Sequence, residues 1–372
     1  SLIMANIQKD EKTGTYYFKI SLGTDPATGK RRQTTRRGFK KKSDAIKAYN
    51  DLKNQYYDGQ INQLQKITLE NFYADYMAIA KNRLKESSYD ARDIAMKNSI
   101  LKKFGSYTLD KIRPLEIQRW MQNQLESGYA ASTINQHLSF FKDLMNKAVE
   151  LEIIASNKIA KVKSLKTERT EMEIWTSDEL EQFLNTFDLN DGKELMYYTL
   201  FKLLFYSGLR INEALALTKK DIVDVHIEVN KIIYMKNKKD WKLTSPKSRY
   251  SNRNVTLDRD TLSTLLTWQQ QAPYDMLFTL DNEPLSRQTV GYFLRKHAQL
   301  AGIKTIRVHD LRHSHASLLI SLNINILAIA KRLGHKDATQ VIETYGHLYP
   351  EYQFDIVKNI EDFKTGSKRG QS

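Results

Sequence analysis

Four helical segments follow one another between Thr68 and about Ala155, and they constrain the fold of this chain more than any other feature. Apolar residues recur at spacings of three and four in LENFYADYMAIAK, YDARDIAMKNSILKKFG, PLEIQRWMQNQLE and ASTINQHLSFFKDLMNKAVE. Pro114 stands at a helix start, and Gly105 and Gly128 follow helix ends. The pattern predicts a compact helical domain over residues 65–166.

A small sheet with one helix is predicted ahead of these segments, in residues 1–64. TYYFKISL (15–22) and KRRQTTRR (30–37) are β-rich runs separated by the turn sequence DPATGK, which is typical of a hairpin. Ser43 is expected to cap a helix through DAIKAYNDLKNQYY. Five basic residues lie on or beside the strands, where they could enter a DNA groove: Lys30, Arg31, Arg32, Arg36 and Arg37.

A third domain, residues 167–372, is predicted after a linker. Residues 156–174 are polar, charged and aperiodic, which is typical of a connection between domains. Thr176 opens a capping box, helices follow through Leu217, and one β-like interval covers residues 226–257. Helices resume at Asp260, EYQFDIVKNIEDF (351–363) has the pattern of an amphipathic helix, and the tail 364–372 is expected to be disordered.

The charge distribution indicates a polyanionic partner. The net charge is +15, and residues 1–64 hold 13 Lys and Arg against 6 Asp and Glu. Residues 65–166 hold 17 against 11, whereas residues 167–372 are nearly balanced at 28 against 26. This distribution fits a nucleic-acid clamp joined to a balanced domain, although a solvated basic surface is the alternative.

Composition excludes several classes of chemistry. The chain has no cysteine, which excludes disulfides, thiolate zinc sites and cysteine nucleophiles. No apolar run approaches the roughly 18 residues of a membrane span, so no membrane partner is expected. We expect a cytoplasmic protein.

The stretch VHDLRHSHAS (308–317) raises two interpretations. His309 and His313 are four residues apart and could share a helix face as zinc ligands, with His315 or His335 as a third ligand. His309 and Arg312 also share a face, and together they suit one phosphate through hydrogen bonding and the guanidinium fork. The second interpretation requires partners elsewhere in the chain.

Such partners are present, each with an ordinary structural alternative. Arg210, in SGLRINEALAL, is a cation at the start of an apolar helix, where an ion pair with Glu213 would also explain it. LGHKDATQVIETYGH presents His335, is expected to cap its second helix with Asp337 and Gln340, and places Tyr345 in the last turn. Taken alone, Tyr345 would be a core aromatic, and Lys247 in SPKSR a solvated turn lysine.

The ordered set GLRINE, SPKSR, HDLRH, LGH and TYGH resembles the tyrosine recombinase (phage integrase) family, in the form found in temperate phages and conjugative transposons. The resemblance spans the whole chain. It implies a multidomain, mainly α protein with small β elements. Residues 1–64 would be an arm-type DNA-binding domain with a three-stranded sheet and a helix, residues 65–166 a helical core-binding domain, and residues 167–372 a mixed α/β catalytic domain.

The resemblance also implies roles for particular residues. Arg210 and Arg312 would grip the non-bridging oxygens of the scissile phosphate, and Tyr345 would be the nucleophile. Lys247 would protonate the leaving 5′ oxygen. His309 and His335 would assist proton transfer and phosphate binding, while Glu213 would have a supporting role. No cofactor or metal is implied, and His313 and His315 are expected to pack or to support the site indirectly.

The function implied by the resemblance is site-specific DNA integration and excision through a 3′-phosphotyrosine intermediate. The expected partners are core and arm-type double-stranded DNA sites, a homotetramer on DNA, an excisionase and a host DNA-bending protein, in a prokaryotic cytoplasm in association with the nucleoid. The C-terminal helix would dock on a neighbouring protomer or on its own domain. The alternatives are a type IB topoisomerase-like relaxase, a non-catalytic DNA-binding regulator with the same fold, and a zinc hydrolase.

Overall fold

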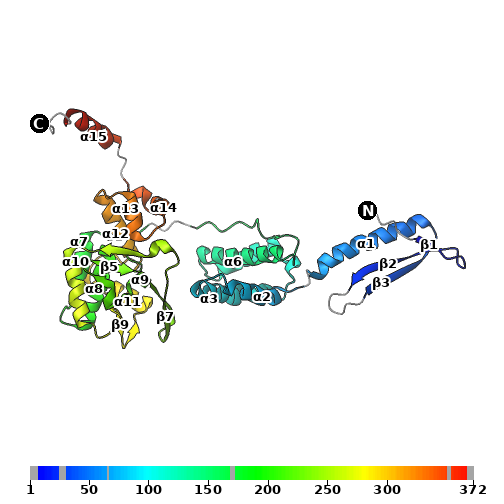
Figure 1. Cartoon of the computed structure of the whole chain (residues 1–372), viewed down its shortest axis with the longest axis horizontal. Coiled ribbons are helices and arrows are strands. Elements are labelled where there is room, and N and C mark those ends of the chain that lie inside the picture. The colour runs from blue at the N-terminus through cyan, green and yellow to red at the C-terminus, as the bar shows by residue number, and fades with distance from the viewer. Residues whose placement is uncertain (1–6, 25–30, 65–66, 168–171, 350–352, 367–372) are drawn as a thin grey trace. The chain divides into compact units, whose positions relative to one another are not determined.

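The chain divides into two compact units, Ser1–Arg169 and Thr170–Ser372 (Figure 1). The structure is a computed structural model that describes residues 7–24, 31–64, 67–167, 172–349 and 353–366. Separate hydrophobic cores form within each unit. Within the described ranges, none of the helices combines the length and apolar character that a bilayer crossing requires.

The first unit begins with the predicted sheet and helix. Its elements are β1 (Ile7–Lys9), β2 (Tyr16–Thr24), β3 (Arg31–Phe39) and α1 (Lys42–Leu64), and the antiparallel sheet has the order β1-β2-β3. Phe18 and Ile20 of β2 are buried and form a small core with Ala45 of α1. The predicted cap at Ser43 is wrong, because α1 begins at Lys42 and Ser43 lies inside it.

The four predicted helical segments are confirmed. They form α2 (Leu69–Lys81), α3 (Glu86–Ala95), α4 (Leu101–Phe104), α5 (Pro114–Glu126) and α6 (Ala131–Glu150). A π-helical turn, Met96–Ile100, joins α3 to α4, and a short 3₁₀ turn, Leu109–Lys111, precedes α5. The apolar faces meet in one core that contains Phe72, Phe104, Trp120 and Phe141.

The predicted linker is wrong in its first half. Ile159 and Val162 are buried in the core of the helical segments. The Asn135 side chain of α6 donates to the Leu165 carbonyl at 2.9 Å and accepts from the Leu165 amide at 2.7 Å. The buried side chains of Ile159 and Val162 and the two hydrogen bonds of Asn135 therefore hold this polar segment against the helical core. Residues 168–171 lie outside the described part of the chain.

The second unit is mixed α/β. Its helices are α7 (Ser177–Leu184), α8 (Gly192–Ser207), α9 (Ile211–Ala214), α10 (Arg259–Gln271), α11 (Arg287–Ala301), α12 (Asp310–Ser321), α13 (Ile326–Leu333), α14 (Thr339–Tyr345) and α15 (Gln353–Gly366). Its 3₁₀ turns are η3 (Lys219–Asp221), η4 (Arg249–Ser251) and η5 (Gly346–Leu348). Thr176 caps α7 with the predicted capping box. Asp337 accepts from the Thr339 amide at the start of α14, but the N-cap position is Ala338, so the predicted capping box with Gln340 is not formed.

The strands of this unit lie mostly in the predicted β-like interval. A three-stranded sheet has the order β4 (Ile222–Val223), β5 (His226–Val229), β8 (Arg253–Thr256), and β6 (Ile232–Asn237) pairs with β7 (Asp240–Thr244). The hairpin of β9 (Thr279–Leu280) and β10 (Glu283–Pro284) was not predicted, because strands of two residues are too short to show alternation. Helix α8 is buried along most of its length and packs against α10 and α12. This packing fixes α12 beside the end of α8.

Candidate active site

Glu213 holds the backbone and one terminal nitrogen of Arg210, while the Arg210 side chain remains partly exposed. It is the N-cap residue of the one-turn helix α9, which follows α8 after Gly208. Glu213 is 1% exposed and accepts from the Arg210 amide at 2.9 Å and from its Nη1 at 3.1 Å. The ion pair considered from the sequence is therefore present. The Arg210 side chain is still 35% exposed, so it can meet a ligand.

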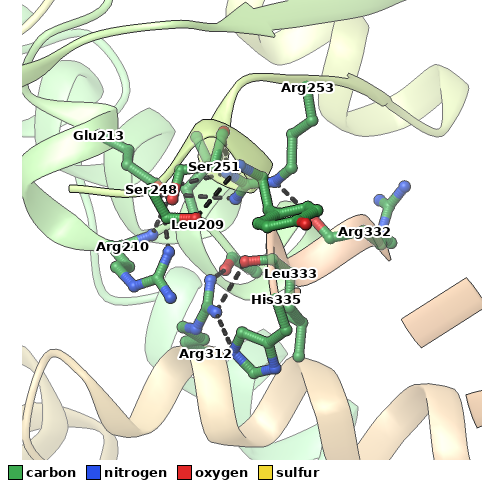
Figure 2. Close-up of polar contacts among 12 residues, drawn as sticks. Leu209, Arg210, Glu213, Ser248, Ser251, Arg253, Arg312, Arg332, Leu333 and His335 are labelled. Atoms are coloured by element: carbon green, nitrogen blue, oxygen red, sulfur yellow. Dashed lines mark hydrogen bonds and ion pairs between the residues drawn. The ribbon is translucent and has the colours of Figure 1, made fainter. Parts of the chain in front are cut away.

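Glu213 is shared with a second arginine, Arg253 of β8, which the sequence alone did not single out. The two terminal nitrogens of Arg253 lie 3.1 and 3.0 Å from the two carboxylate oxygens of Glu213 (Figure 2). Arg253 also donates to the Arg332 carbonyl at 2.7 Å and to the Ser251 carbonyl at 2.9 Å. Burial alone would raise the pKa of Glu213, but Arg253 and Arg210 hold that pKa below its usual range.

Arg312 of α12 is buried and binds only neutral groups. Its Nη1 donates to the Gly208 carbonyl at 2.7 Å. Its Nη2 donates to the Leu333 carbonyl at 2.8 Å and to His335 Nε2 at 2.9 Å (Figure 2). Gly208 and Leu333 lie at the C-terminal ends of α8 and α13, where the helix dipole favours a cation. Burial and the charge of Arg210 lower the pKa of Arg312 to about 9, so it stays charged at neutral pH.

Two glycines with left-handed backbones permit this packing. Gly208 has φ +70°, and a Cβ there would lie 2.5 Å from His315 Cδ2 and 2.8 Å from Leu333 Cδ2. Gly334 has φ +74°, and a Cβ there would lie 2.8 Å from Arg253 Nη1. Only glycine lets the ends of α8 and α13 approach closely enough to contact the two arginines.

These contacts produce an excess of positive charge. Arg210, Arg253 and Arg312 surround one carboxylate, that of Glu213. Arg253 forms a bidentate ion pair with that carboxylate, whereas Arg312 donates its hydrogen bonds to uncharged carbonyls, which do not neutralise its charge. An anion such as a phosphate would relieve the repulsion between Arg312 and Arg210. The arrangement is therefore preorganised for an anionic ligand.

Tyr345 ends α14 inside a small apolar cluster with Leu333 and Val341, and is 2% exposed. Its hydroxyl lies 2.7 Å from His313 Nδ1. Burial raises the pKa of Tyr345, whereas the charges of Arg312 and Arg210 lower it. Both cations thus act on the phenol, and the structure brings the three predicted residues to one place. The contact of His313 with Tyr345 was missed, because the sequence marks His313 only by its helical spacing from His309 and its position next to Arg312.

The two predicted histidines have different environments. His335 Nε2 must be the acceptor toward Arg312, since a guanidinium has no acceptor, and the proton then stands on Nδ1. That Nδ1 atom is buried and has no hydrogen-bond partner among the described residues. Burial and the charge of Arg312 lower the pKa of His335 to about 4, and they also lower that of His309 at the start of α12. His335 is therefore neutral at neutral pH, and its Nδ1–H is a donor without a partner among the described residues.

Other predicted residues are not joined to this cluster. Lys247 is exposed on the loop between β7 and η4, and no hydrogen bond or ion pair links it to the cluster in the described part of the chain. Arg31, Arg32, Arg36 and Arg37 lie on β3 in the other unit, and Lys30 lies outside the described residues. Arg37 lies over the Tyr17 ring, with 5.0 Å between the guanidinium carbon and the ring centroid.

The histidines of the zinc interpretation have separate partners. The His309 and His313 rings meet edge to face at 4.8 Å, but His313 binds Tyr345 and His315 Nε2 accepts from Arg332 at 3.0 Å. Among the residues that the structure describes, no group of three or more His, Asp and Glu is arranged as a ligand set.

Replacing Arg253 by methionine is expected to lower the free energy of unfolding by about 3 kcal/mol, because Glu213 would keep a buried charge without its bidentate partner. Urea unfolding of the full chain, followed by tryptophan fluorescence, measures this. The double variant Arg253→Met with Glu213→Gln leaves no unpaired buried carboxylate and should recover part of the loss. Equal losses in the single and double variants would show that the ion pair is not the cause.

Comparison with family models identifies the class of the protein. Residues 173–351 match the phage integrase family, residues 6–56 an arm DNA-binding domain, and residues 68–125 the N-terminal SAM-like domain of phage integrases. With the site described above, these matches define a site-specific recombinase of the tyrosine type. The chain belongs to the phage integrase family and resembles the integrases of phages and conjugative transposons.

Individual relatives align with 80% or more of this chain. The ICEBs1 integrase of Bacillus subtilis is 26% identical over 371 residues, covering 95% of this chain and 99% of the relative. The integrase of Staphylococcus phage L54a is 24% identical, covering 81% and 94%. Among solved structures, the Tn1549 transposon integrase with circular intermediate DNA has a TM-score of 0.68 at 19% identity, covering 80% of this chain and 99% of that one. A lambda integrase tetramer on a Holliday junction has a TM-score of 0.61 at 18% identity, covering 91% and 98%.

Proposed function

We propose that the chain cuts and rejoins DNA strands at specific sites, with Tyr345 as the nucleophile, and so integrates and excises a mobile element. The observation that carries this proposal is the buried Tyr345 hydroxyl under the charges of Arg312 and Arg210. The integrases of ICEBs1 and phage L54a, which align with most of this chain, support the mobile-element part.

The proposed roles follow from the charge that develops in the reaction. In-line attack on a phosphodiester gathers negative charge on the equatorial oxygens, and fixed cations stabilise that charge. Arg210 and Arg312 are proposed to hold these oxygens, with the free Nδ1–H of His335 as a further donor. Glu213 would keep Arg210 in place.

Proton transfer completes the proposed mechanism. The leaving 5′ oxygen needs a proton, which Lys247 on its exposed loop is proposed to supply as a general acid, while His309 assists proton transfer. The 3′-phosphotyrosine conserves the energy of the broken bond, so the 5′ hydroxyl of another strand can reverse the step.

A nicked duplex that carries the joined ends of the encoding element tests this function. Loss of the short fragment beyond the nick should trap the protein on the 3′ side of the cut, and sequencing the product maps the cleavage position. Denaturing gels show the covalent complex. Tight binding with no cleavage of any such site would favour the non-catalytic regulator, and relaxation of plasmids that lack the site would favour the relaxase.

The N-terminal residues are proposed to read a second class of DNA site. In this proposal residues 1–64 bind arm-type sites, residues 65–166 bind core sites, and residues 167–372 carry out catalysis. The basic strand β3 and the match of residues 6–56 to an arm DNA-binding domain support the first part. Lys30, Arg31, Arg32, Arg36 and Arg37 would contact DNA.

Deleting residues 1–64 is expected to make DNA affinity less dependent on salt. Each phosphate that the protein neutralises releases counterions and makes the slope of log K against log salt more negative by about 0.9. Titrations on arm-type and core DNA at several salt concentrations measure that slope. Replacing Arg31, Arg36 and Arg37 by alanine should give an intermediate slope, and a slope unchanged by the deletion would contradict the arm assignment.

A homotetramer on DNA is the proposed working form, aided by an excisionase and a host DNA-bending protein, in a prokaryotic cytoplasm at the nucleoid. Solved relatives include a lambda integrase dimer on a core site and a tetramer on a Holliday junction. Helix α15 leaves an apolar face uncovered, with Ile356, Val357, Ile360 and Phe363 between 48% and 73% exposed. We expect this face to dock on a neighbouring protomer.

A further inference from the structure

The Tyr345 hydroxyl has one side-chain partner among the described residues, and that partner is His313. The His313 Nδ1 atom and the hydroxyl oxygen are 2.7 Å apart, and the two rings meet edge to face at 5.5 Å. His313 follows Arg312 directly on α12. The helix turn that fixes the buried guanidinium therefore also fixes the imidazole against the phenol.

The other histidines of the cluster make no such contact. His335 Nε2 is already engaged by Arg312 Nη2. His309 contacts the His313 ring, and the described residues include no hydrogen bond from His309 to the phenol. The nearby carboxylate, Asp310, is occupied by Arg307, which binds its two oxygens at 2.8 and 3.0 Å. Within the described part of the chain, His313 is thus the base that lies within hydrogen-bond distance of the hydroxyl.

His313 is neutral in the DNA-free protein. Burial, with His309, Arg312 and Arg307 around it, lowers its pKa to about 4, and Asp310 opposes this shift. A neutral imidazole can accept the phenolic proton. A bound phosphodiester would place a negative charge beside Arg312 and Arg210, and a nearby anion raises the pKa of an imidazole. DNA binding would therefore increase the basicity of His313.

We propose, on the basis that Tyr345 is the nucleophile, that His313 is a catalytic base that takes the Tyr345 proton during cleavage and returns it during rejoining. In cleavage the O–H bond of Tyr345 breaks and its proton moves to Nδ1 of His313. The phenolic oxygen bonds to phosphorus and the bond from phosphorus to the 5′ oxygen breaks. The 5′ oxygen takes a proton from Lys247, which leaves an imidazolium and a neutral amine, and rejoining reverses every transfer.

Cleavage of two matched nicked duplexes separates this role from that of Lys247. One duplex has the natural 5′ oxygen at the cleavage position, and the other has a bridging 5′ sulfur, whose thiolate leaves without protonation. His313→Ala and His313→Asn should each slow single-turnover cleavage by about 10²-fold or more on both duplexes. Lys247→Ala should be slow on the oxygen duplex alone. Asparagine matters because its amide oxygen can accept a hydrogen bond and yet cannot take up the proton.

Controls distinguish failure of this role from failure of the proposed function. An adduct that wild type forms and Tyr345→Phe does not form establishes the nucleophile independently of His313. His347→Ala, at an exposed histidine two residues beyond Tyr345, should cleave at the wild-type rate. Unchanged DNA binding, together with partial rescue of His313→Ala by added imidazole, would separate proton transfer from a structural defect.

Three results would overturn the assignment. The first is wild-type cleavage by His313→Asn, which would reduce the residue to a hydrogen-bond acceptor. The second is recovery of the His313 variants on the sulfur duplex, which would move the residue to the leaving group. The third is a His313→Ala variant that binds DNA normally and gains nothing from imidazole, which would leave only a structural role.

Discussion

Replacing Tyr345 by phenylalanine is expected to abolish the covalent protein–DNA product while leaving the fold and the DNA affinity almost unchanged. Phenylalanine keeps the ring that packs with Leu333 and Val341 but lacks the atom that would bond to phosphorus. The lost hydrogen bond to His313 costs about 1 kcal/mol, a small part of the stability of a domain. The loss of cleavage should therefore be complete, and unfolding is not its cause.

Denaturing gels on the nicked duplex measure the adduct, and gel shifts on an intact duplex measure binding. Tyr292→Phe is the matched control, since Tyr292 is 55% exposed on α11 and is not among the residues that pack with Tyr345. An adduct that persists in Tyr345→Phe would identify another nucleophile. It would also remove the basis for the assignment of His313.

Local sequence patterns predicted most of the secondary structure. The four segments between Thr68 and Ala155 became helices because their apolar residues repeat at the helical period. The linker failed for the opposite reason. Residues 156–167 bury Ile159 and Val162 without any periodicity, and their fixed position depends on Asn135, which lies 30 residues from its partner Leu165. A contact at that separation leaves no local pattern.

The candidate site also depends on contacts between residues that are far apart in the sequence, which local patterns do not predict. Arg210, Arg312 and Tyr345 lie in motifs that the resemblance to the family made readable, and the structure brings them together. Arg253 was not predicted, and His313 was expected only to pack or to support the site indirectly, since the importance of both comes from partners on other elements. Arg253 reaches Glu213, 40 residues away, and His313 reaches Tyr345, 32 residues away. Only the three-dimensional fold defines such pairs.

Arg253 and Arg312 are stabilised by different kinds of partner, and this difference determines what each arginine can do. Arg253 is neutralised by the carboxylate of Glu213 and links β8 to the ends of α9 and α13. Arg312 is held by the carbonyls at the ends of α8 and α13, which stabilise a cation without cancelling its charge. We therefore expect Arg253 to position the site and Arg312 to be the cation whose charge acts on a phosphate.

Replacing Arg312 by alanine is expected to slow cleavage at saturating DNA by about 10²- to 10³-fold, the usual cost of removing one preorganised charge-stabilising donor. The variant also leaves the carbonyls of Gly208 and Leu333 without their donor, which costs about 1–3 kcal/mol of stability for each buried group. Single-turnover cleavage and urea unfolding measure the two effects separately.

The variant Arg312→Lys distinguishes the effect of the positive charge from the effect of the guanidinium geometry. Its ammonium group restores the charge but lacks the planar fork that reaches two carbonyls and His335 at once, so Arg312→Lys should recover little of the cleavage rate. Arg259→Ala, at an exposed arginine at the start of α10, controls for general loss of positive charge. Wild-type cleavage by Arg312→Ala would show that the guanidinium held between α8 and α13 serves the fold alone, and the phosphate would then have to be bound elsewhere.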